Sequence, residues 1–181
     1  MNFQQIRTAD HPQLAFVQAL YETSFPWQER RAWQQVLQLL PEPAMQLWLV
    51  QEEERPVAFL ICWQLEHWCY LEHFAVDPLE RGKQYGAAIM DQLISRSEGK
   101  LLLEVERPHD PDSQRRIRFY ERLGFRLLDI DYYQPAYRTG EPTVPMLLLS
   151  YSFIEDPHAV IHLADLLSTT VYQRYYDKLN G

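Results

Sequence analysis

LEHFAVDPLERGKQYGAAIMDQL, residues 71–93, is the stretch that decides the fold. It begins as a predicted strand that ends near Val76, passes through a turn at 81–86, and continues as a predicted helix over 84–97 with an apolar stripe on one side. A strand that leads into a helix in this way presents backbone N–H groups at the positive end of the helix dipole. We therefore expect an anion, such as a phosphate or pyrophosphate, at residues 81–86.

Two common phosphate-binding motifs are excluded at this turn. A Walker A loop needs the pattern GxxxxGK[ST], and a dinucleotide-binding fingerprint needs GxGxxG. The turn reads Arg81-Gly82-Lys83-Gln84-Tyr85-Gly86 and contains neither pattern.

Apolar periodicity and turn residues predict the remaining elements on both sides of this stretch. We expect strands at 3–8, 45–52, 56–66, 69–77, 101–105, 126–133 and 144–153, and helices at 12–23, 28–40, 84–97 and from the N-cap Asp110 to Gly124. The order is βααβββαβαββ. Because 69–105 reads strand, helix, strand, it requires a right-handed parallel crossover inside an otherwise antiparallel sheet. The predicted fold class is α/β, with a mixed, mostly antiparallel sheet of seven strands in a single domain over 1–156.

Residues 157–181 predict a C-terminal amphipathic helix. Val160, Leu163, Leu167, Val171 and Tyr175 share one face of it. We expect this face to pack on the rest of the domain, and a contact with a second chain is the alternative.

Composition limits the classes of partner. Lys plus Arg number 17 and Asp plus Glu 25, so the net charge of −8 disfavours a nucleic-acid partner. The longest apolar run, 57–63, is too short to cross a bilayer, and the N-terminal residues carry no leader pattern. We expect a cytoplasmic protein without a membrane partner. Cys62 and Cys69 lack metal-ligand spacing, so no metal site is expected.

Two motifs in the chain resemble the GNAT superfamily of acyl-CoA-dependent N-acetyltransferases. The family's Q/R-x-x-G-x-G/A loop is matched by Arg81 and Gly86, with Gln84 where the family usually has glycine. The stretch SQRRIRFYERLGF, residues 113–125, is similar to the family's N-x-x-A-x-x-F-Y-x-x-x-G-F helix. Its residues in register are Phe119, Tyr120, Gly124 and Phe125, whereas Ser113 and Arg116 replace the asparagine and the alanine.

The resemblance implies acetyl-CoA as cofactor, with its pantetheine arm between two parallel strands that splay apart, here 70–77 and 100–107. It implies Tyr120 as the general acid toward the sulfur of coenzyme A, and a strand bulge whose backbone amide near Val76 polarises the thioester. The residues then expected to bind the cofactor are Phe74, Ala75, Val76, Arg81, Gly82, Lys83, Gln84, Tyr85, Gly86, Ser113 and Phe119.

An alkyl amine has a pKa of about 10.4, so it must lose a proton before it can attack. Glu72 and Glu104 are the candidate bases, and deprotonation through water is the alternative. We expect Glu72 on the same side of its strand as Phe74 and Val76. His73, expected on the opposite side, is a further candidate base, but a lone histidine beside Phe and Ala is more often a hydrogen-bonded core residue.

In the family, the first helix pair and the last strand connection select the acceptor. These segments correspond to 22–30 and 132–145, and they are rich in aromatic and acidic residues. Their rings suit a cation, so we expect them to hold the amine of a small molecule or a peptide. The candidate acceptor-binding residues are Trp27, Tyr132, Tyr133 and Tyr137.

Three functions remain open from the sequence. The first is an enzyme, monomeric or homodimeric, that moves an acetyl group from acetyl-CoA to a primary amine by direct attack. The second is a sensor or interaction module that binds acyl-CoA without turnover, which Gln84, Ser113 and Arg116 favour. The third is a structural or assembly protein that uses the C-terminal helix.

Overall fold

The computed structural model describes residues 1–180 of the chain. Within that range the strands are β1 (Asn2–Ile6), β2 (Met45–Glu52), β3 (Arg55–Leu65), β4 (Trp68–Val76), β5 (Leu101–Glu106), β6 (Arg126–Leu127), β7 (Tyr132–Gln134) and β8 (Val144–Ser150). The helices are α1 (Leu14–Ser24), α2 (Trp33–Leu39), α3 (Tyr85–Arg96), α4 (Pro111–Arg122), α5 (Pro157–Leu167) and α6 (Arg174–Asn180). Two short 3₁₀ helices, η1 (Trp27–Glu29) and η2 (Pro78–Glu80), and a π-helical segment, η3 (Ser168–Gln173), complete the order.

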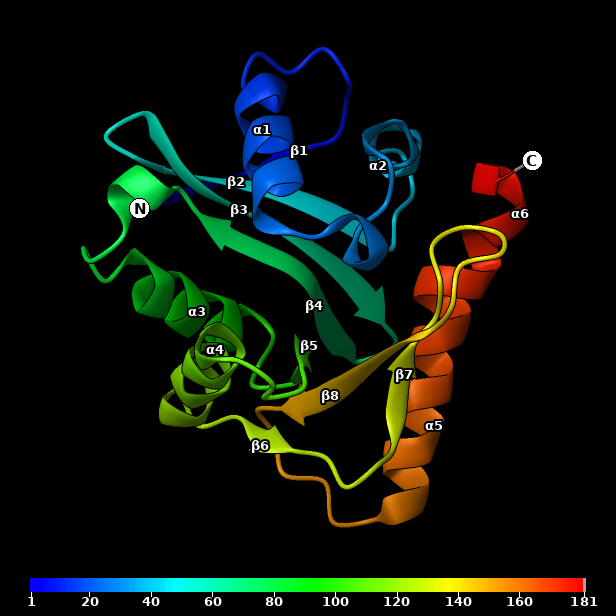
Figure 1. The fold of residues 1–181 in the computed structure, drawn as a ribbon. Coiled ribbons are helices and arrows are strands. Elements are labelled where there is room, and N and C mark those ends of the chain that lie inside the picture. Colours follow the sequence, from blue (N-terminus) through cyan, green and yellow to red (C-terminus); the bar gives the residue numbers. More distant parts are fainter. Residues whose placement is uncertain (181) are drawn as a thin grey trace.

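These strands form one sheet in the order β1-β2-β3-β4-β5-β8-β6, and β7 also pairs with β8. The pair β4–β5 is parallel and the other pairs are antiparallel, which confirms the expected mixed sheet. Figure 1 shows α1 and α2 above the β2–β4 part of the sheet and α3 and α4 below it. One apolar core lies on each face: Tyr21 and Val36 belong to the first, Ile89 and Tyr120 to the second.

The prediction of seven strands is wrong by one, because the strand expected at 126–133 is interrupted. Leu127 pairs with Leu149, but Tyr132 pairs with Met146. The four residues 128–131 therefore lie opposite only two residues of β8. The Leu128 N–H still donates to the Leu148 carbonyl at 2.9 Å, but the regular pairing is interrupted and divides the predicted strand into β6 and β7.

The helix expected at 28–40 is also shorter than predicted. The backbone is extended at Arg30 and Ala32, between η1 and α2. Arg31 lies in this extended link, where its backbone N–H donates to the Tyr21 hydroxyl at 2.8 Å. The contact of Arg31 with Tyr21 thus stabilises the extended backbone that separates η1 from α2.

The two helices that carry the sequence motifs have the expected ends. α3 begins one residue after Gln84, and the chain leaves it through Gly99 in the left-handed region, at φ +76°. Asp110 caps α4 through the backbone N–H of Ser113, and Gly124 follows the helix at φ +98°. These signals are local, so the sequence carries them by itself.

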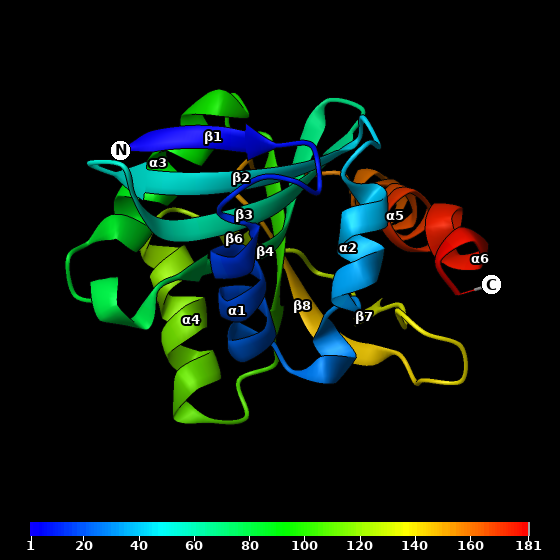
Figure 2. The same cartoon turned by 90° about the horizontal axis from the view of Figure 1, so that it is seen from above.

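The C-terminal segment is helical in three consecutive parts, α5, η3 and α6, and Figure 2 shows α5 and α6 on the right, on the side of α2. Gln35 Nε2 of α2 donates to the backbone carbonyl of Leu179 in α6 at 2.9 Å. The predicted apolar residues Val160, Leu163, Leu167, Val171 and Tyr175 are buried in the core on the α1 side. The last residue of the predicted segment, Gly181, lies outside the described residues. No helix within residues 1–180 is long and apolar enough to cross a membrane.

Candidate active site

The parallel strands β4 and β5 separate in the middle of the sheet. They pair only from Cys69 with Leu101 to Leu71 with Leu103. Beyond this point a cavity of about 250 Å³ opens between them. Its lining includes residues 70–76 of β4, 103–106 of β5, Arg116 and Tyr120 of α4, Glu29 of η1 and Gln134 of β7. The two strands expected to splay apart, 70–77 and 100–107, are the ones that separate.

A β-bulge in β4 lies at the start of the cavity. Leu71 pairs with Cys62 and His73 with Ile61, so Glu72 has no partner on β3. Consequently Glu72 and His73 point to the same face, toward α1, where the His73 ring packs 4.5 Å from the ring of Phe25. This corrects two expectations: the bulge is at Glu72 rather than near Val76, and Glu72 does not share a side with Phe74 and Val76.

Backbone amides of the outer part of β4 face the cavity. The N–H of Asp77 donates to the carbonyl of Val57 in the direction of β3. Backbone N–H groups alternate between the two edges of a strand, so those of Val76 and Phe74 point to the opposite edge. That edge has lost its pairing with β5, so these two amides can donate to a ligand between the strands.

Glu72 is buried in a network of donors. Trp63 Nε1 donates to Oε2 at 2.7 Å, the Tyr137 hydroxyl donates to Oε1 at 2.9 Å, and the Arg31 guanidinium lies 3.4 Å from Oε1. Burial opposes the charge, but Arg31, with His73 and Trp63, lowers the pKa of Glu72 to about 2. Glu72 is therefore a permanently ionised partner of Arg31 at neutral pH.

Glu104 lies across the cavity in a different environment. The Tyr132 hydroxyl donates to Oε1 at 2.5 Å, and the Tyr172 hydroxyl lies 3.3 Å from Oε1 and 3.5 Å from Oε2. Burial raises the pKa of Glu104 to about 7, and the charge of Glu72 adds to the rise, whereas the hydroxyls of Tyr132, Tyr70 and Tyr172 oppose it. A carboxyl group with this pKa can take up and release a proton near neutral pH.

Tyr120 lines the same cavity from α4. Its ring packs against the rings of Phe119 and Phe125, at 5.1 and 5.6 Å between centroids. Burial raises the pKa of Tyr120 to about 12, so the hydroxyl keeps its proton at neutral pH. Tyr120 therefore lines the cavity in its protonated form.

A groove of about 650 Å³ adjoins the cavity, and both are lined by Val76 and Arg81. The groove runs over the N-terminus of α3, whose first N–H groups have no partner within the helix. The backbone is left-handed at Gly82 and at Gln84, with φ +82° and +62°. A Cβ at Gly86 would lie 3.6 Å from Cζ of Phe119. Because both residues line the groove, a larger side chain at position 86 would fill part of it.

Most of the residues predicted to bind the cofactor line this cavity or groove. They are Phe74, Ala75, Val76, Arg81, Gly82, Gln84, Tyr85, Gly86 and Phe119. Two others have different surroundings. Lys83 Nζ is hydrogen-bonded to Glu80 at 2.7 Å, and Ser113 is buried in the capping box of α4, where its Oγ donates to the Asp110 carbonyl.

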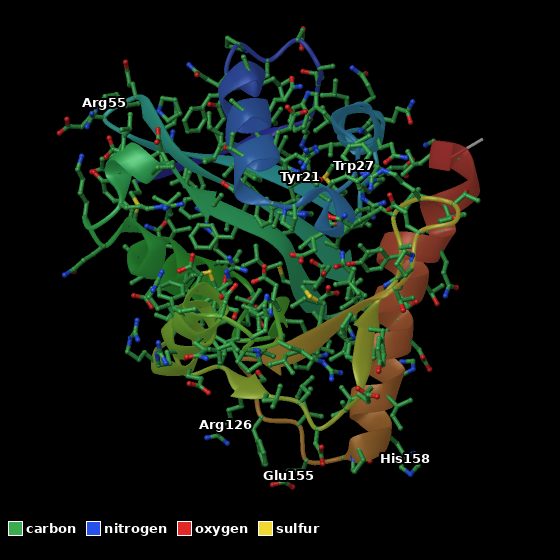
Figure 3. All side chains as sticks on the ribbon, viewed as in Figure 1. Tyr21, Trp27, Arg55, Arg126, Glu155 and His158 are labelled. Atoms are coloured by element: carbon green, nitrogen blue, oxygen red, sulfur yellow. The ribbon has the colours of Figure 1, made fainter. Side chains whose placement is uncertain are left out.

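The four predicted acceptor-binding rings do not form one pocket. Trp27 lies at the surface between α1 and α2, with the guanidinium of Arg138 3.5 Å from its ring centroid (Figure 3). Tyr133 is exposed beneath Arg107. Tyr132 and Tyr137 are buried and donate to Glu104 and Glu72, respectively. Arginines of the chain itself therefore lie over Trp27, Tyr133 and Tyr137, where we expected a ligand cation.

Several residues of the site were not selected from the sequence. Arg31 and Tyr172 carry the contacts to the two glutamates, and Glu29 and Gln134 line the cavity. Burial, together with the nearby charge of Glu106, raises the pKa of Glu29 to about 7. The buried Oε1 of Gln134 has no hydrogen-bond partner among the described residues. Glu29 and Gln134 had a sequence signal, because they lie inside the aromatic and acidic segments 22–30 and 132–145, whereas Arg31 and Tyr172 had none.

A splayed parallel pair, amides on its open edge and a helix N-terminus without a side-chain cap agree with the acyltransferase fold that the two sequence motifs implied. The sequence profile of the acetyltransferase (GNAT) family matches residues 14–125, and the chain belongs to this family. A sequence comparison with curated proteins gives no significant match.

Solved structures agree with this assignment. A protein described as a GNAT-family acetyltransferase from Bacteroides thetaiotaomicron is 31% identical, with a TM-score of 0.89 over 95% of this chain and 98% of that one. The ribosomal-protein-S18-alanine N-acetyltransferase of Escherichia coli is 20% identical, with a TM-score of 0.59 over 86% and 96%. A GNAT-family acetyltransferase of Elizabethkingia anophelis with acetyl-CoA bound is 16% identical, with a TM-score of 0.58 over 84% and 97%. The chain is thus an acyltransferase by family and by fold.

Proposed function

We propose that this enzyme transfers an acetyl group from acetyl-CoA to a primary amine of a small molecule or peptide by direct attack. The observation that carries the proposal is the arrangement around one cavity of Glu104, the open edge of β4 and Tyr120. A base, amide donors and an acid are the three groups that acyl transfer to an amine requires.

The groove over α3 fits the cofactor. Its left-handed turn and the free N–H groups of Tyr85, Gly86 and Ala87 suit a pyrophosphate, and Arg81 and Arg122 add positive charge along its walls. The groove continues into the cavity at Val76, so a pantetheine arm that follows it ends between β4 and β5. Acetyl-CoA would supply a thioester carbonyl there.

Glu104 is the better of the two candidate bases. Its pKa of about 7 lets it accept the proton of an ammonium group that enters the cavity. Glu72, with its pKa of about 2 and its contacts to Arg31, Trp63 and Tyr137, is a weak base with little capacity for a further ligand. We assign Glu72 the role of holding β4 in its bulged form.

The remaining roles belong to β4 and α4. The N–H groups of Phe74 and Val76 can donate to the carbonyl oxygen on which negative charge develops. The hydroxyl of Tyr120 can give its proton to the departing sulfur, which needs only modest help because a thiol has a pKa of about 8.5.

The acceptor side of the cavity is acidic. Glu29 and Glu106 line it together with Arg116, which is ion-paired with Glu106, and with the unpaired carboxamide oxygen of Gln134. This lining favours a positively charged amine that also carries a hydrogen-bond donor. The E. coli neighbour, which acts on an alanine of a ribosomal protein, makes a peptide α-amine one acceptor to test.

The test is thiol release from acetyl-CoA in the presence of a panel of amines that includes peptides with free N-termini, diamines and amino sugars. We expect release that depends on both enzyme and amine, and its loss in Glu104→Gln. Stabilisation by coenzyme A without thiol release for any amine would instead favour the acyl-CoA sensor. Indifference to coenzyme A would favour an assembly protein, although the apolar face that such a protein would use is buried within this chain.

A further inference from the structure

The C-terminal segment, which lies outside the region matched by the family profile, enters the active site. The Tyr172 hydroxyl lies 3.3 Å from Oε1 and 3.5 Å from Oε2 of Glu104. It also lies 3.3 Å from the hydroxyl of Tyr70 on β4. Tyr172 is buried, so this hydroxyl has exchanged water for these partners.

The π-helical segment η3 explains how Tyr172 reaches this position. A π-helical turn is wider than an α-helical turn, and here Val171 and Tyr172, adjacent in sequence, are both buried. The carbonyl of Val171 accepts a hydrogen bond from Arg31 Nη2 at 2.6 Å. Arg31 is the ion-pair partner of Glu72. Two neighbouring residues of η3 are therefore connected to the two glutamates: Val171 to Glu72 through Arg31, and Tyr172 directly to Glu104.

The hydrogen bonds at Glu104 are unevenly divided between its two oxygens. Oε1 receives the short bond from Tyr132 and the closer contact of Tyr172. Oε2 lies 3.5 Å from the Tyr172 hydroxyl. The Tyr70 hydroxyl also acts on this carboxylate and, like those of Tyr132 and Tyr172, lowers the pKa of Glu104. The contacts of Tyr132 and Tyr172 are closer at Oε1 than at Oε2, so they orient the carboxylate with Oε2 as the oxygen that has more capacity for another proton.

Charged and titratable groups approach Glu104 from every element packed around it. Tyr70, Glu72 and His73 come from β4, Tyr132 from β7, Tyr172 from η3, Glu106 from β5, Glu29 from η1, and Arg116 and Tyr120 from α4. Glu72 is neutralised by Arg31, and Glu106 is paired with Arg116. The phenols are thus the donors in direct contact with the Glu104 carboxylate.

We propose that Tyr172 is a positioning residue for the base Glu104, and that η3 is for this reason a part of the catalytic site. The inference rests on the proposed function. Tyr172 does not touch the reacting atoms: its hydroxyl, which accepts from Tyr70, donates to the carboxylate and stabilises its ionised form. Burial raises the pKa of Glu104 and the hydrogen bond from Tyr172 lowers it. Without this donor the pKa of Glu104 rises, so the carboxyl group keeps its proton to higher pH.

The test compares Tyr172→Phe with Tyr175→Phe. Tyr175 lies in the same C-terminal segment, but its hydroxyl contacts Glu42 rather than the cavity. The first readout is a ¹³C NMR titration of the glutamate side-chain carboxyls, with the Glu104 signal assigned by its loss in Glu104→Gln. The second is the pH dependence of kcat/KM for thiol release.

For Tyr172→Phe we expect the midpoint of the Glu104 titration and the acid limb of kcat/KM to move up together by about 0.5 to 1 pH unit. Tyr175→Phe is expected to leave both unchanged. In a second variant, 3,5-difluorotyrosine at position 172 keeps the ring and has a more acidic hydroxyl, so it is expected to move both midpoints down. This variant keeps the test decisive if Tyr172→Phe does not fold.

An unchanged Glu104 titration in the folded variants would overturn the inference whatever their activity. Active enzymes with a shifted titration but an unshifted acid limb would also overturn it, because Glu104 would then not be the base. If the titration shifts and no amine gives thiol release even with the wild type, the proposed function fails and the base role fails with it. The titration needs no activity, so these failures are distinguishable.

Discussion

Gln84 shows how a single residue sets the shape of the cofactor groove. Its backbone is left-handed, at φ 62° and ψ 12°, directly before α3. Only glycine adopts this conformation without steric cost, which gives a physical reason for the glycine that the family usually has there. The chain therefore retains the turn geometry at the expense of local strain.

Gln84→Gly is expected to relieve this strain and to raise the free energy of unfolding by up to about 1 kcal/mol. Urea denaturation measures the change. Gly82→Ala is the matched control: its φ is +82° and nothing lies within 4 Å of the added Cβ, so it should destabilise through conformation alone. Equal stability of Gln84→Gly and the wild type would show that the left-handed turn carries no strain.

Tyr120 carries the second prediction at this scale. Tyr120→Phe keeps the ring contacts with Phe119 and Phe125 and removes only the proton donor. We expect kcat to fall by about 10- to 100-fold, while the dissociation constant of acetyl-CoA remains nearly unchanged. Steady-state kinetics and calorimetry measure the two quantities. A fall in affinity with normal kcat would assign the hydroxyl to binding.

At the scale of elements, the site depends on where strands stop pairing. The bulge at Glu72 places two consecutive side chains on one face, and the loss of β4–β5 pairing after Leu71 frees the edge amides. α3 then presents its N-terminus beside this edge. None of these elements is unusual alone, and the site results from their junction.

Gly86→Trp tests the junction of α3 with the groove. The indole would fill the space against Phe119, and we expect acetyl-CoA affinity to fall at least about 10-fold, or 1.4 kcal/mol. Gly86→Ala is the control, since its Cβ would make an ordinary contact at 3.6 Å with Phe119. Calorimetric titration measures both. Unaltered binding by a folded Gly86→Trp would remove the groove from the cofactor path.

The elements differ in how far the sequence predicts them. The bounds of α3 and α4 depend on local signals, namely the apolar stripe, the Asp110 cap and Gly124, and these were predicted to within one or two residues. The break after Leu127 and the bulge at Glu72 depend on pairing with other strands, so the regular alternation of residues 71–76 conceals the bulge. Contacts such as that of Arg31 with Val171, 140 residues apart, have no local pattern.

At the scale of the whole molecule, the two glutamates give opposite contributions to stability. The pKa of Glu72 is lowered to about 2, so its contribution is present above about pH 4.5 and is lost as the pH falls. The pKa of Glu104 is raised to about 7, so the folded state binds its proton more tightly and stability falls between about pH 4.5 and 7. At neutral pH, the raised pKa of Glu104 therefore lowers the free energy of unfolding.

Glu104→Gln is therefore expected to raise the free energy of unfolding at pH 8 by about 2 to 3 kcal/mol, although it removes the base. The gain should shrink toward zero near pH 4.5, where the wild-type carboxyl group is protonated when folded. Thermal unfolding from pH 4.5 to 8 measures the difference. A gain that does not depend on pH would contradict the raised pKa of Glu104.

The measurement that tests the central claim most directly is the pH dependence of kcat/KM for amine-dependent thiol release, compared among wild type, Glu104→Gln and Glu29→Gln. We predict an acid limb with a midpoint near pH 7 in the wild type, retained in Glu29→Gln and absent from the residual activity of Glu104→Gln. The same limb in Glu104→Gln at undiminished activity would contradict the claim that Glu104 is the base of an N-acetyltransferase.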